Sequence, residues 1–433
     1  MNSINPKLNL FDLTMIVISL VIGIGIFRTP SVIAQSINDP LFFILAWIVG
    51  GIISFIGALV YAELGSRFQK PGGYYKIVAE NYNPVLAFML NWVAIFINGA
   101  GAANVAIIGA EYFNPILKYY IHYDVSSNYI AIILITILMF LNFLGIKTGA
   151  RIQNILTIIK IFLILLIISS LFFVDKSNNF EIINKNNNNL INFGIGLISV
   201  FYTYGGYQAT MNFGGDIINS NKNLPKGILF GSIIILSLYL LINFTYIKIL
   251  GIEGIKNSKL VAASTAEVIF GWYGYYFVSI TIFLSALGFL NVNLMQTPRS
   301  YYAMAEDKVL PKIFLNFNPK TQVQEFALFF YWITIIISLI FLSTFEKILN
   351  YVMFTDSITI AVVASTIFIL RNKQKNHEGY MMIGFPFLPI LFIIILLSIS
   401  FFVLISSTES ALFGTAIFLI GYPVFKIMRY INK

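Results

Sequence analysis

Long apolar runs separated by short polar segments repeat along the whole chain of 433 residues. Each run reaches about 20 residues, the length that an α-helix needs to cross the roughly 30 Å hydrocarbon core of a bilayer. The pattern therefore predicts an all-α integral membrane protein with about twelve membrane-spanning helices. The expected spans are Phe11–Gln35, Pro40–Arg67, Pro84–Tyr112, Asn128–Gly145, Ala150–Val174, Leu190–Phe213, Lys226–Leu250, Trp272–Ala305, Glu325–Ser343, Lys347–Leu370, Tyr380–Ile405 and Ser410–Arg429.

Glycines interrupt the first and the sixth of these spans near their middle. Gly23 and Gly25 lie in LVIGIGIFRTP, and Gly205 and Gly206 lie in FYTYGGYQ. Glycine is a poor helix former, and hydrocarbon has no water to satisfy backbone groups that a broken helix exposes. In secondary transporters, substrates and coupling ions bind such groups. Two interrupted spans therefore predict discontinuous helices and a membrane transporter.

Composition supports the membrane assignment and limits the chemistry. Hydrophobic residues make up 58% and charged residues 10% of the chain, whereas soluble domains contain roughly 25% charged residues. No polar stretch is long enough for a separate soluble domain, so we expect one transmembrane domain over residues 1–433. The chain has no cysteine, and both histidines fall in predicted loops. We expect no catalytic site, no metal and no cofactor, because HExxH and GxSxG motifs are also missing.

The net charge of +9 reflects topology rather than a nucleic-acid partner. Most of the 27 lysines and arginines fall in loops on one side of the predicted membrane. Cytoplasmic loops carry such an excess of positive charge. The distribution predicts a multi-pass protein of the cytoplasmic membrane with both termini in the cytoplasm, and no role in nucleic-acid binding.

The break in the first span has the chemistry to bind an amino acid. If the helix resumes near Ile26, its free amide groups from Gly25 to Phe27 suit a carboxylate. The carbonyl groups that end the first half suit an ammonium group. A break at Thr203 to Gly206 would add further carbonyl groups. The alternative is that these glycines only allow helices to pack closely.

Small residues crowd the third span in NGAGAAN, from Asn98 to Asn104. Such residues allow helix backbones to approach each other closely. Tight packing and the lining of a cavity are both compatible with this pattern.

Four sequence motifs carry a resemblance to a known family. They are GIGIF from Gly23, YAELGSRFQKPGGYY from Tyr61, GGDIINSNKNLPKGI from Gly214 and QTPRSYYAMAEDKVLPKIF from Gln296. In this order they resemble the amino acid–polyamine–organocation (APC) superfamily, in particular its L-type amino-acid transporter branch. Three positions differ from the family pattern: Ile24 replaces a serine, Gly205 stands where relatives often have serine or aspartate, and Gly215 replaces the first of two glutamates and leaves Asp216.

The resemblance implies an architecture and a set of site residues. It implies a LeuT-like 5+5 inverted repeat, with repeat 1 at about 11–174, repeat 2 at about 190–370 and two additional helices at about 380–429. The implied substrate site lies between the first and sixth helices. Tyr204 stands where the family carries a gating aromatic residue; the alternative is a packing aromatic. The implied substrate-binding residues are Gly23, Ile24, Gly25, Ile26, Phe27, Thr203, Tyr204, Gly205 and Gly206.

Lys160 is a charge deep in the fifth span. Nine helical residues separate it from Arg151 at the predicted cytoplasmic end, which places it roughly 13 Å deep. A charge inside a membrane costs at least about 2.5–3.5 kcal/mol, so we expect a partner or a function. By the resemblance, this lysine occupies the place where sodium-coupled relatives bind the ion, which implies transport without sodium. A structural lysine bonded to carbonyl groups at a helix end is the alternative, and proton coupling remains open.

Four further charged residues lie inside or near spans. Arg28 follows the expected carboxylate site and could pair with Glu111 at an external gate, or could lie in a watery vestibule. Glu63 is expected to hold the cytoplasmic end together through hydrogen bonds. Asp356 could face a cavity, and the sequence names no partner for it.

The residues and the resemblance together predict a transporter that moves amino acids by alternating access. Sodium-independent exchange of neutral amino acids is the expected activity, with the substrate and the lipid bilayer as partners. The alternative is a proton-coupled carrier of amino acids, polyamines or organic cations with the same fold; a membrane enzyme or a channel is a remote alternative. Some mammalian relatives attach to a glycoprotein through a cysteine, and a chain without cysteine cannot form that link.

Overall fold

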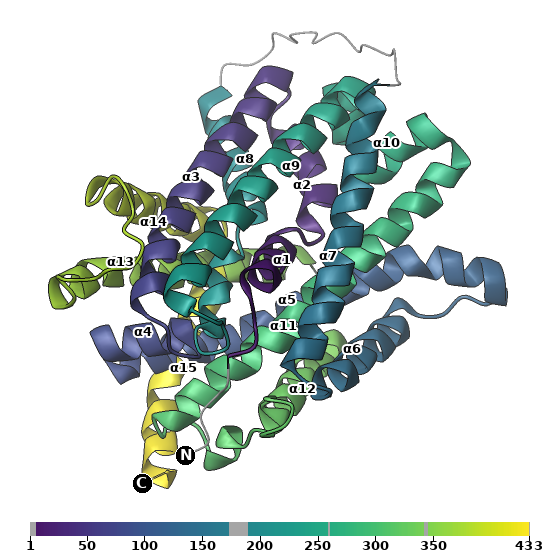
Figure 1. The fold of residues 1–433 in the computed structure, drawn as a ribbon. Coiled ribbons are helices and arrows are strands. Elements are labelled where there is room, and N and C mark those ends of the chain that lie inside the picture. Colours follow the sequence, from purple (N-terminus) through teal and green to yellow (C-terminus); the bar gives the residue numbers. More distant parts are fainter. Residues whose placement is uncertain (1–5, 173–188, 259, 342–344, 433) are drawn as a thin grey trace.

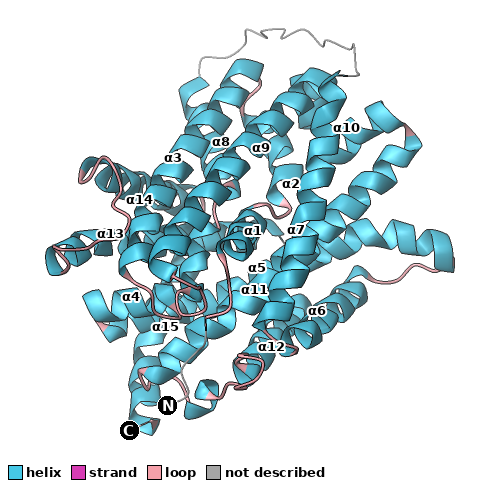
Figure 2. Ribbon diagram, viewed as in Figure 1, coloured by secondary structure: helices cyan, strands magenta, loops and turns pink. Residues whose placement is uncertain are grey.

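The computed structural model describes residues 6–172, 189–258, 260–341 and 345–432, which form a bundle of helices (Figures 1 and 2). Three short 3₁₀ helices are η1 (Ser170–Phe172), η2 (Tyr207–Phe213) and η3 (Lys312–Leu315). No β-strand occurs among the described residues. The α-helices are α1 (Leu10–Val21), α2 (Gly25–Ser36), α3 (Pro40–Arg67), α4 (Gly73–Asn81), α5 (Pro84–Ile121), α6 (Ser127–Phe143), α7 (Ile146–Ser169), α8 (Asn189–Thr203), α9 (Ser220–Asn257), α10 (Val261–Phe270), α11 (Trp272–Glu306), α12 (Glu325–Phe341), α13 (Phe345–Lys373), α14 (Phe387–Ser406) and α15 (Thr408–Ile431).

These helices confirm an all-α, multi-pass membrane protein. Nine helical segments of the described residues are long and apolar enough to cross a membrane. The shorter helices α6, α8 and α12 fall on three further predicted spans. The predicted ends of two spans, after residues 172 and 341, lie outside the described residues.

Three features differ from the sequence-based expectation. The short helices α4 and α10 connect longer helices and were not predicted. The predicted start of a span at Tyr380 was wrong, because α14 begins at Phe387. Pro386 precedes that start, and proline lacks the amide hydrogen of a helix interior and restricts the residue before it. Residues 380–386 therefore form a connecting segment.

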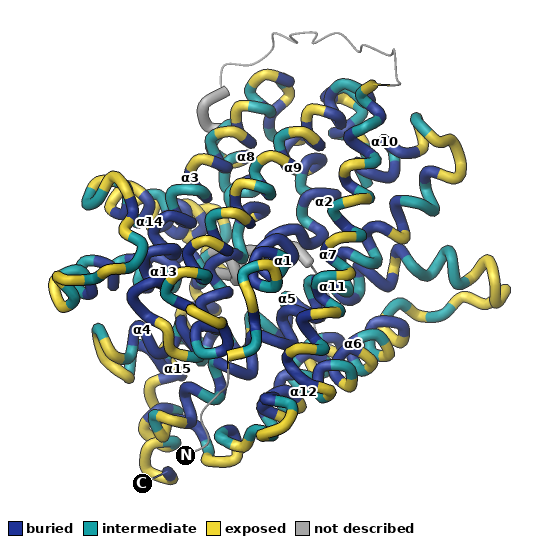
Figure 3. The backbone as a smooth tube through the Cα atoms, in the orientation of Figure 1, coloured by how far each residue is buried: buried dark blue, intermediate teal, exposed yellow. Residues whose placement is uncertain are grey.

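Helices differ in how much of their surface is buried (Figure 3). In the most apolar window, 67% of residues are buried in Leu10–Ser36 and also in Trp272–Glu306, against 33% in α14 and 22% in the part of α15 from Ala411 to Ile431. The exposed side chains of α14 and α15 include Phe401 and Leu412. Apolar side chains on the outside of a helix bundle are suited to lipid. The broken first span and α11 form the centre of the bundle, while α14 and α15 lie at its edge.

A buried carboxylate links α3 to α13. Glu63 is fully buried, and its Oε1 accepts a hydrogen bond from Nε of Arg67 at 2.7 Å. Its Oε2 accepts from Nη2 of Arg371 at 2.6 Å and from the amide of Met382 at 2.9 Å. A buried charge is stable only when it is paired and hydrogen-bonded. The network confirms that Glu63 holds this end of the bundle together.

The segment before α1 is attached to the loop after η2. The backbone oxygen of Asp216 accepts hydrogen bonds from the amides of Lys7 at 2.8 Å and Leu8 at 2.9 Å. The Asp216 carboxylate pairs with Arg299 of α11, with 2.5 Å between Oδ2 and Nε. The guanidinium carbon of Arg299 lies 4.8 Å from the ring centre of Phe213. Asp216 thus supplies a carboxylate at this junction, although Gly215 stands where the family pattern has another acidic residue.

Lys76 attaches α4 to the end of α11 through ion pairs. Its Nζ lies 2.6 Å from Oδ1 of Asp307 and 3.2 Å from Oε2 of Glu306. Burial by itself lowers the pKa of Lys76, but the hydrogen bond and charge of Asp307, together with Glu306, raise it above its ordinary value. Lys76 therefore stays charged and holds α4 against the end of α11.

Candidate functional site

The first predicted break is present between α1 and α2. The helix ends at Val21, and the backbone of Ile22 has a non-helical conformation with φ −77° and ψ 78°. A new helix begins at Gly25. The break coincides with the two glycines of GIGIF, as expected from their low helix propensity.

The second predicted break is present after α8. The helix ends at Thr203, and the chain turns at Gly206, whose φ is +120°. A side chain is strained at this φ, and a Cβ atom on Gly206 would collide with the backbone oxygen of Leu20. The two breaks therefore contact each other, and the close approach requires glycine at this position.

The carbonyl groups at the end of α1 already have partners from the protein. The oxygen of Val21 accepts a hydrogen bond from the Tyr239 hydroxyl at 3.0 Å, and that of Gly23 accepts from Oγ of Ser285 at 3.3 Å. The oxygen of Ile22 accepts from Nζ of Lys160. The Val21 oxygen also accepts a hydrogen bond from the amide of Gly23 at 2.8 Å. The negative end of this half-helix is therefore already partly neutralised.

Two of the three amide groups that were expected to be free at the start of α2 have no such partner, whereas the amide of Phe27 donates to the oxygen of Ile24 at 3.0 Å. Within the described residues, the amides of Gly25 and Ile26 donate no hydrogen bond. The first amides of any helix lack a partner inside the helix, and the positive end of its dipole attracts an anion. The start of α2 can therefore bind one carboxylate group.

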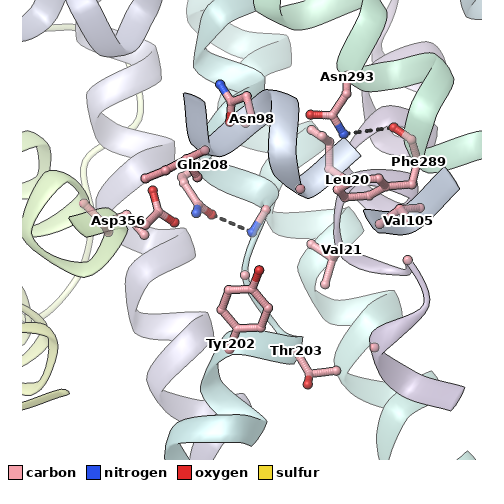
Figure 4. Close-up of a pocket in the computed structure, with 18 of the residues that line it drawn as sticks. Leu20, Val21, Asn98, Val105, Tyr202, Thr203, Gln208, Phe289, Asn293 and Asp356 are labelled. Atoms are coloured by element: carbon pink, nitrogen blue, oxygen red, sulfur yellow. Dashed lines mark hydrogen bonds between the residues drawn. The ribbon is translucent and has the colours of Figure 1, made fainter. Parts of the chain in front are cut away.

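A cavity of about 330 Å³ lies between the two breaks. This volume is within the range of about 300–1,000 Å³ that small-molecule sites occupy. Figure 4 shows residues from both breaks, from α5, from α11 and from α13 around it. Six of the predicted residues line the cavity: Gly23, Ile24, Gly25, Thr203, Gly205 and Gly206.

The other predicted substrate residues do not line the cavity in this conformation. Ile26 and Phe27 are buried, with exposed fractions of 0% and 1%. The Tyr204 ring packs against Tyr239, with 4.9 Å between ring centres, and its hydroxyl donates to the oxygen of Trp47 at 3.3 Å. Tyr204 therefore has the contacts of a packing aromatic in this conformation.

Several lining residues were not identified from the sequence. Tyr202 of α8 lines the cavity and is 39% exposed, and Gln208 accepts a hydrogen bond from the amide of Gly206 at 2.9 Å. Phe289 and Asn293 of α11 also line it. Helix α11 carries no glycine break, so no local signal identified its side chains.

The third predicted span gave a partial signal. Asn98, Gly101 and Asn104 of its small-residue run line the cavity. Other members of the run pack closely: a Cβ on Gly99 would lie 3.3 Å from the oxygen of Thr334. Packing and cavity lining are both realised in the same segment of α5.

Lys160 lies fully buried beside the first break. Its Nζ donates to Oγ of Ser19 at 3.2 Å and to the oxygen of Ile22. A cation is favourable at the carbonyl end of a helix. Lys160 therefore joins α7 to the carbonyl end of α1, which is the contact expected of a structural lysine.

Of the other charged residues that the sequence singled out near the site, two line the cavity and one does not. Arg28 of α2 and Asp356 of α13 line the cavity. Glu111, the expected partner of Arg28, is exposed on α5 and is not part of the lining.

A multi-pass helical bundle with two broken helices around a central cavity has the structure of a membrane transporter. The chain belongs to the amino acid permease family, whose profile matches residues 8–422. This confirms the resemblance to the APC superfamily.

Individual relatives match nearly the whole chain. The serine/threonine exchanger SteT of Bacillus subtilis (strain 168) is 30% identical over 99% of this chain and 98% of its own length. The large neutral amino acids transporter small subunit 2 of Oryctolagus cuniculus is 26% identical over 99% of this chain and 81% of its own. The human cystine/glutamate transporter is 26% identical over 99% of this chain and 86% of its own. The L-type relatives support the branch that the motifs indicate.

Proposed function

We propose that this protein exchanges neutral amino acids across the cytoplasmic membrane, without sodium, by alternating access. One observation carries the proposal: the amide of Gly25, which donates no hydrogen bond among the described residues, begins a helix at a small central cavity that Gly25 lines. Relatives over the full length include an exchanger of serine and threonine and a transporter of large neutral amino acids. Their names support the same class of substrate.

The substrate carboxylate binds the amides at the start of α2. The α-ammonium group binds backbone oxygens at the two breaks, where Thr203, Gly205 and Gly206 supply part of the cavity wall. Binding bridges the two broken helices, and their outer halves then tilt over the substrate. A ligand shifts this equilibrium only if it binds the closed form more tightly than the open form. In that closed form Ile26, Phe27 and Tyr204 contact the substrate, and Tyr204 acts as a gate.

Two inverted repeats at about 11–174 and 190–370 supply the two broken helices, and the helices from 380 to 429 are additional. Such repeats place the substrate site near the middle of the bilayer. Both termini lie in the cytoplasm in this proposal, because basic residues are concentrated in the loops on that side.

Lys160 replaces a coupling ion in the proposed mechanism. Its ammonium group already neutralises the carbonyl end of α1. A sodium ion at the same position would face a positive charge within a few ångströms, which is unfavourable in a medium of low dielectric constant. Exchange then depends on substrate on both sides rather than on a sodium gradient.

Counterflow in proteoliposomes tests the proposal. The purified protein is reconstituted, and uptake of radiolabelled threonine, alanine and leucine is measured with and without the unlabelled amino acid inside. Preloading is expected to stimulate uptake, and replacing sodium by choline is expected to leave it unchanged. Uptake into empty liposomes that requires a sodium gradient would contradict the proposal. Uptake driven by an imposed pH gradient would favour the alternative, a proton-coupled carrier.

A further inference from the structure

Four basic side chains, the basic cluster, lie at one end of the bundle and come from three segments that are distant in sequence. Lys7 belongs to the segment before α1, Lys147 and Arg151 belong to the first turns of α7, and Lys320 belongs to the loop before α12. All except the half-buried Lys7 are exposed. None of the four forms an ion pair with a carboxylate that the structure describes.

Hydrogen bonds bring the three segments of the basic cluster together. Nζ of Lys7 donates to the backbone oxygen of Lys320 at 3.4 Å, and the amide of Ile146 donates to the oxygen of Thr321 at 3.2 Å. A Cβ on Gly145 would lie 3.1 Å from the same Thr321 oxygen, so the turn between α6 and α7 packs tightly against this loop. Figure 1 shows α6, α7 and α12 meeting at the lower end of the bundle, where both termini also lie.

The acidic side chains on the same segments do not neutralise the basic cluster. Oδ1 of Asp12 accepts a hydrogen bond from Nδ2 of Asn154 at 2.6 Å. Oε1 of Glu325 accepts from Nδ2 of Asn318 at 2.9 Å. Both donors are neutral amides, and the two carboxylates are outnumbered by the four cations. An excess of positive charge therefore remains at this surface.

An exposed apolar face of α7 continues directly from the basic cluster. Ile155, Ile158 and Phe162 follow Arg151 at spacings of four, seven and eleven residues, which keeps them on one face of the helix. All three side chains are exposed, whereas Lys160 on another face of α7 is fully buried. Eleven residues rise about 16 Å, close to half of the roughly 30 Å hydrocarbon core. The apolar face therefore has the length of one acyl chain in one leaflet.

We propose that the basic cluster and the adjoining face of α7 bind one anionic diacyl phospholipid from the leaflet on that side. Its phosphate group lies among the four cations, and an acyl chain lies along Ile155, Ile158 and Phe162. The inference does not depend on the transported substrate, because it needs only a chain embedded in a membrane. The bound lipid ties the segment before α1 to the start of α7 and to the loop before α12, and so stabilises this end of the bundle.

The expected selectivity follows from charge. Each lysine or arginine near a membrane surface strengthens the attraction of an anionic lipid by about a fivefold factor in affinity. A zwitterionic lipid with the same acyl chains carries a cation of its own, which the basic cluster repels. A free phosphate ion carries the negative charge but has no chain to cover the apolar face of α7. Preference for an anionic lipid over both is the signature of this site.

Native mass spectrometry of the purified full-length protein tests the proposal, with dioleoyl phosphatidylglycerol and dioleoyl phosphatidylcholine as the two titrated lipids. The wild type is expected to bind phosphatidylglycerol at least about tenfold more tightly. The triple variant Lys7→Gln, Lys147→Gln, Lys320→Gln is expected to bind it about a hundredfold more weakly and to keep its affinity for phosphatidylcholine. Phosphatidylglycerol should also raise the unfolding temperature of the wild type more than that of the triple variant.

The matched control carries Lys308→Gln, Lys375→Gln and Lys426→Gln, which remove the same charge from exposed positions scattered over the same side of the predicted membrane. It is expected to keep the preference for phosphatidylglycerol. Equal affinities of the wild type for the two lipids would overturn the inference. Equal losses in the two triple variants would also overturn it, because the general surface charge would then explain the binding.

Other occupants of this surface give different results. Inorganic phosphate that raises the unfolding temperature as much as phosphatidylglycerol would overturn the inference in favour of a simple anion site. A dimer that is lost in the variant of Lys7, Lys147 and Lys320 would overturn it in favour of a second copy of the chain. If that variant does not fold, Lys147→Gln decides, because Lys147 forms no hydrogen bond between side chains in the described part of the chain. An unchanged affinity of Lys147→Gln for phosphatidylglycerol would then refute the site.

Discussion

Lys160 shows how one side chain changes the chemistry of a backbone break. Its ammonium group donates to the oxygen of Ile22 and to Oγ of Ser19, from a helix more than a hundred residues away in sequence. The carbonyl end of α1 therefore has a fixed cation that belongs to the protein. The amide of Gly25 has no comparable partner among the described residues and remains open to a ligand.

Replacing this lysine by methionine removes the charge and keeps most of the stem. We expect Lys160→Met to destabilise the fold by about 1.5–3 kcal/mol, because Ile22 and Ser19 lose a charged donor. Uptake should fall as well, since the end of α1 is no longer held in place. Thermal unfolding in detergent and counterflow uptake measure the two effects. Lys222→Met, at an exposed position, is the control. Unchanged unfolding and uptake in Lys160→Met would show that the contact has no structural role.

At the scale of elements, the two broken helices depend on each other. The turn at Gly206 lies against the last turn of α1, and a Cβ on Gly25 would lie 3.1 Å from Cγ2 of Thr203. At each break, a larger side chain in place of glycine would collide with the backbone or side chain of the other break. The cavity therefore results from the pair of breaks and not from either one alone.

Gly206→Ala tests this dependence. The substitution introduces a strained backbone at φ +120° and a Cβ that displaces the backbone of Leu20. Strain of this kind costs about 1–3 kcal/mol, and we expect substrate binding and uptake to be lost or strongly reduced.

Gly194→Ala in α8, the helix that precedes this turn, is the control, because a Cβ there meets no heavy atom within 4 Å. It is expected to behave like the wild type in calorimetric binding and in uptake. Normal binding by Gly206→Ala would mean that the breaks tolerate separation.

At the scale of the whole molecule, the distribution of apolar surface defines the membrane-embedded part. The centre of the bundle is buried and its outer helices expose large apolar side chains (Figure 3). Packing of small residues and polar contacts holds such bundles together, because lipid offers no hydrophobic driving force between helices. The buried links of Glu63 and of Asp216 with Arg299 supply this kind of contact at one end.

The absence of cysteine allows a direct test of the proposed orientation. Tyr120 is 74% exposed at the end of α5, and Lys375 is exposed after α13. In intact cells, a membrane-impermeant maleimide is expected to label Tyr120→Cys and to label Lys375→Cys only after permeabilisation. The unmodified chain is the background control. The reverse labelling pattern would place both termini outside.

Local sequence determined most of the fold. Runs of about 20 apolar residues predict spanning helices because a bilayer demands that length. Glycines lie at both breaks, where their low helix propensity favours an interruption. Gly23, Gly25, Gly205 and Gly206 line the cavity between these breaks. The residues around Pro386 show the limit, because hydropathy alone placed the start of α14 too early.

Only the tertiary structure decided which groups at the breaks are occupied and which remain open. Tyr239, Lys160 and Ser285 reach the oxygens at the end of α1 from three distant helices. The sequence could not assign these contacts, because they depend on how the helices pack. In the same way, packing turned Tyr204 towards Trp47 and left Tyr202 and Asp356 at the cavity. Helix formation is set by neighbours along the chain, whereas the chemistry of the site is set by neighbours in space.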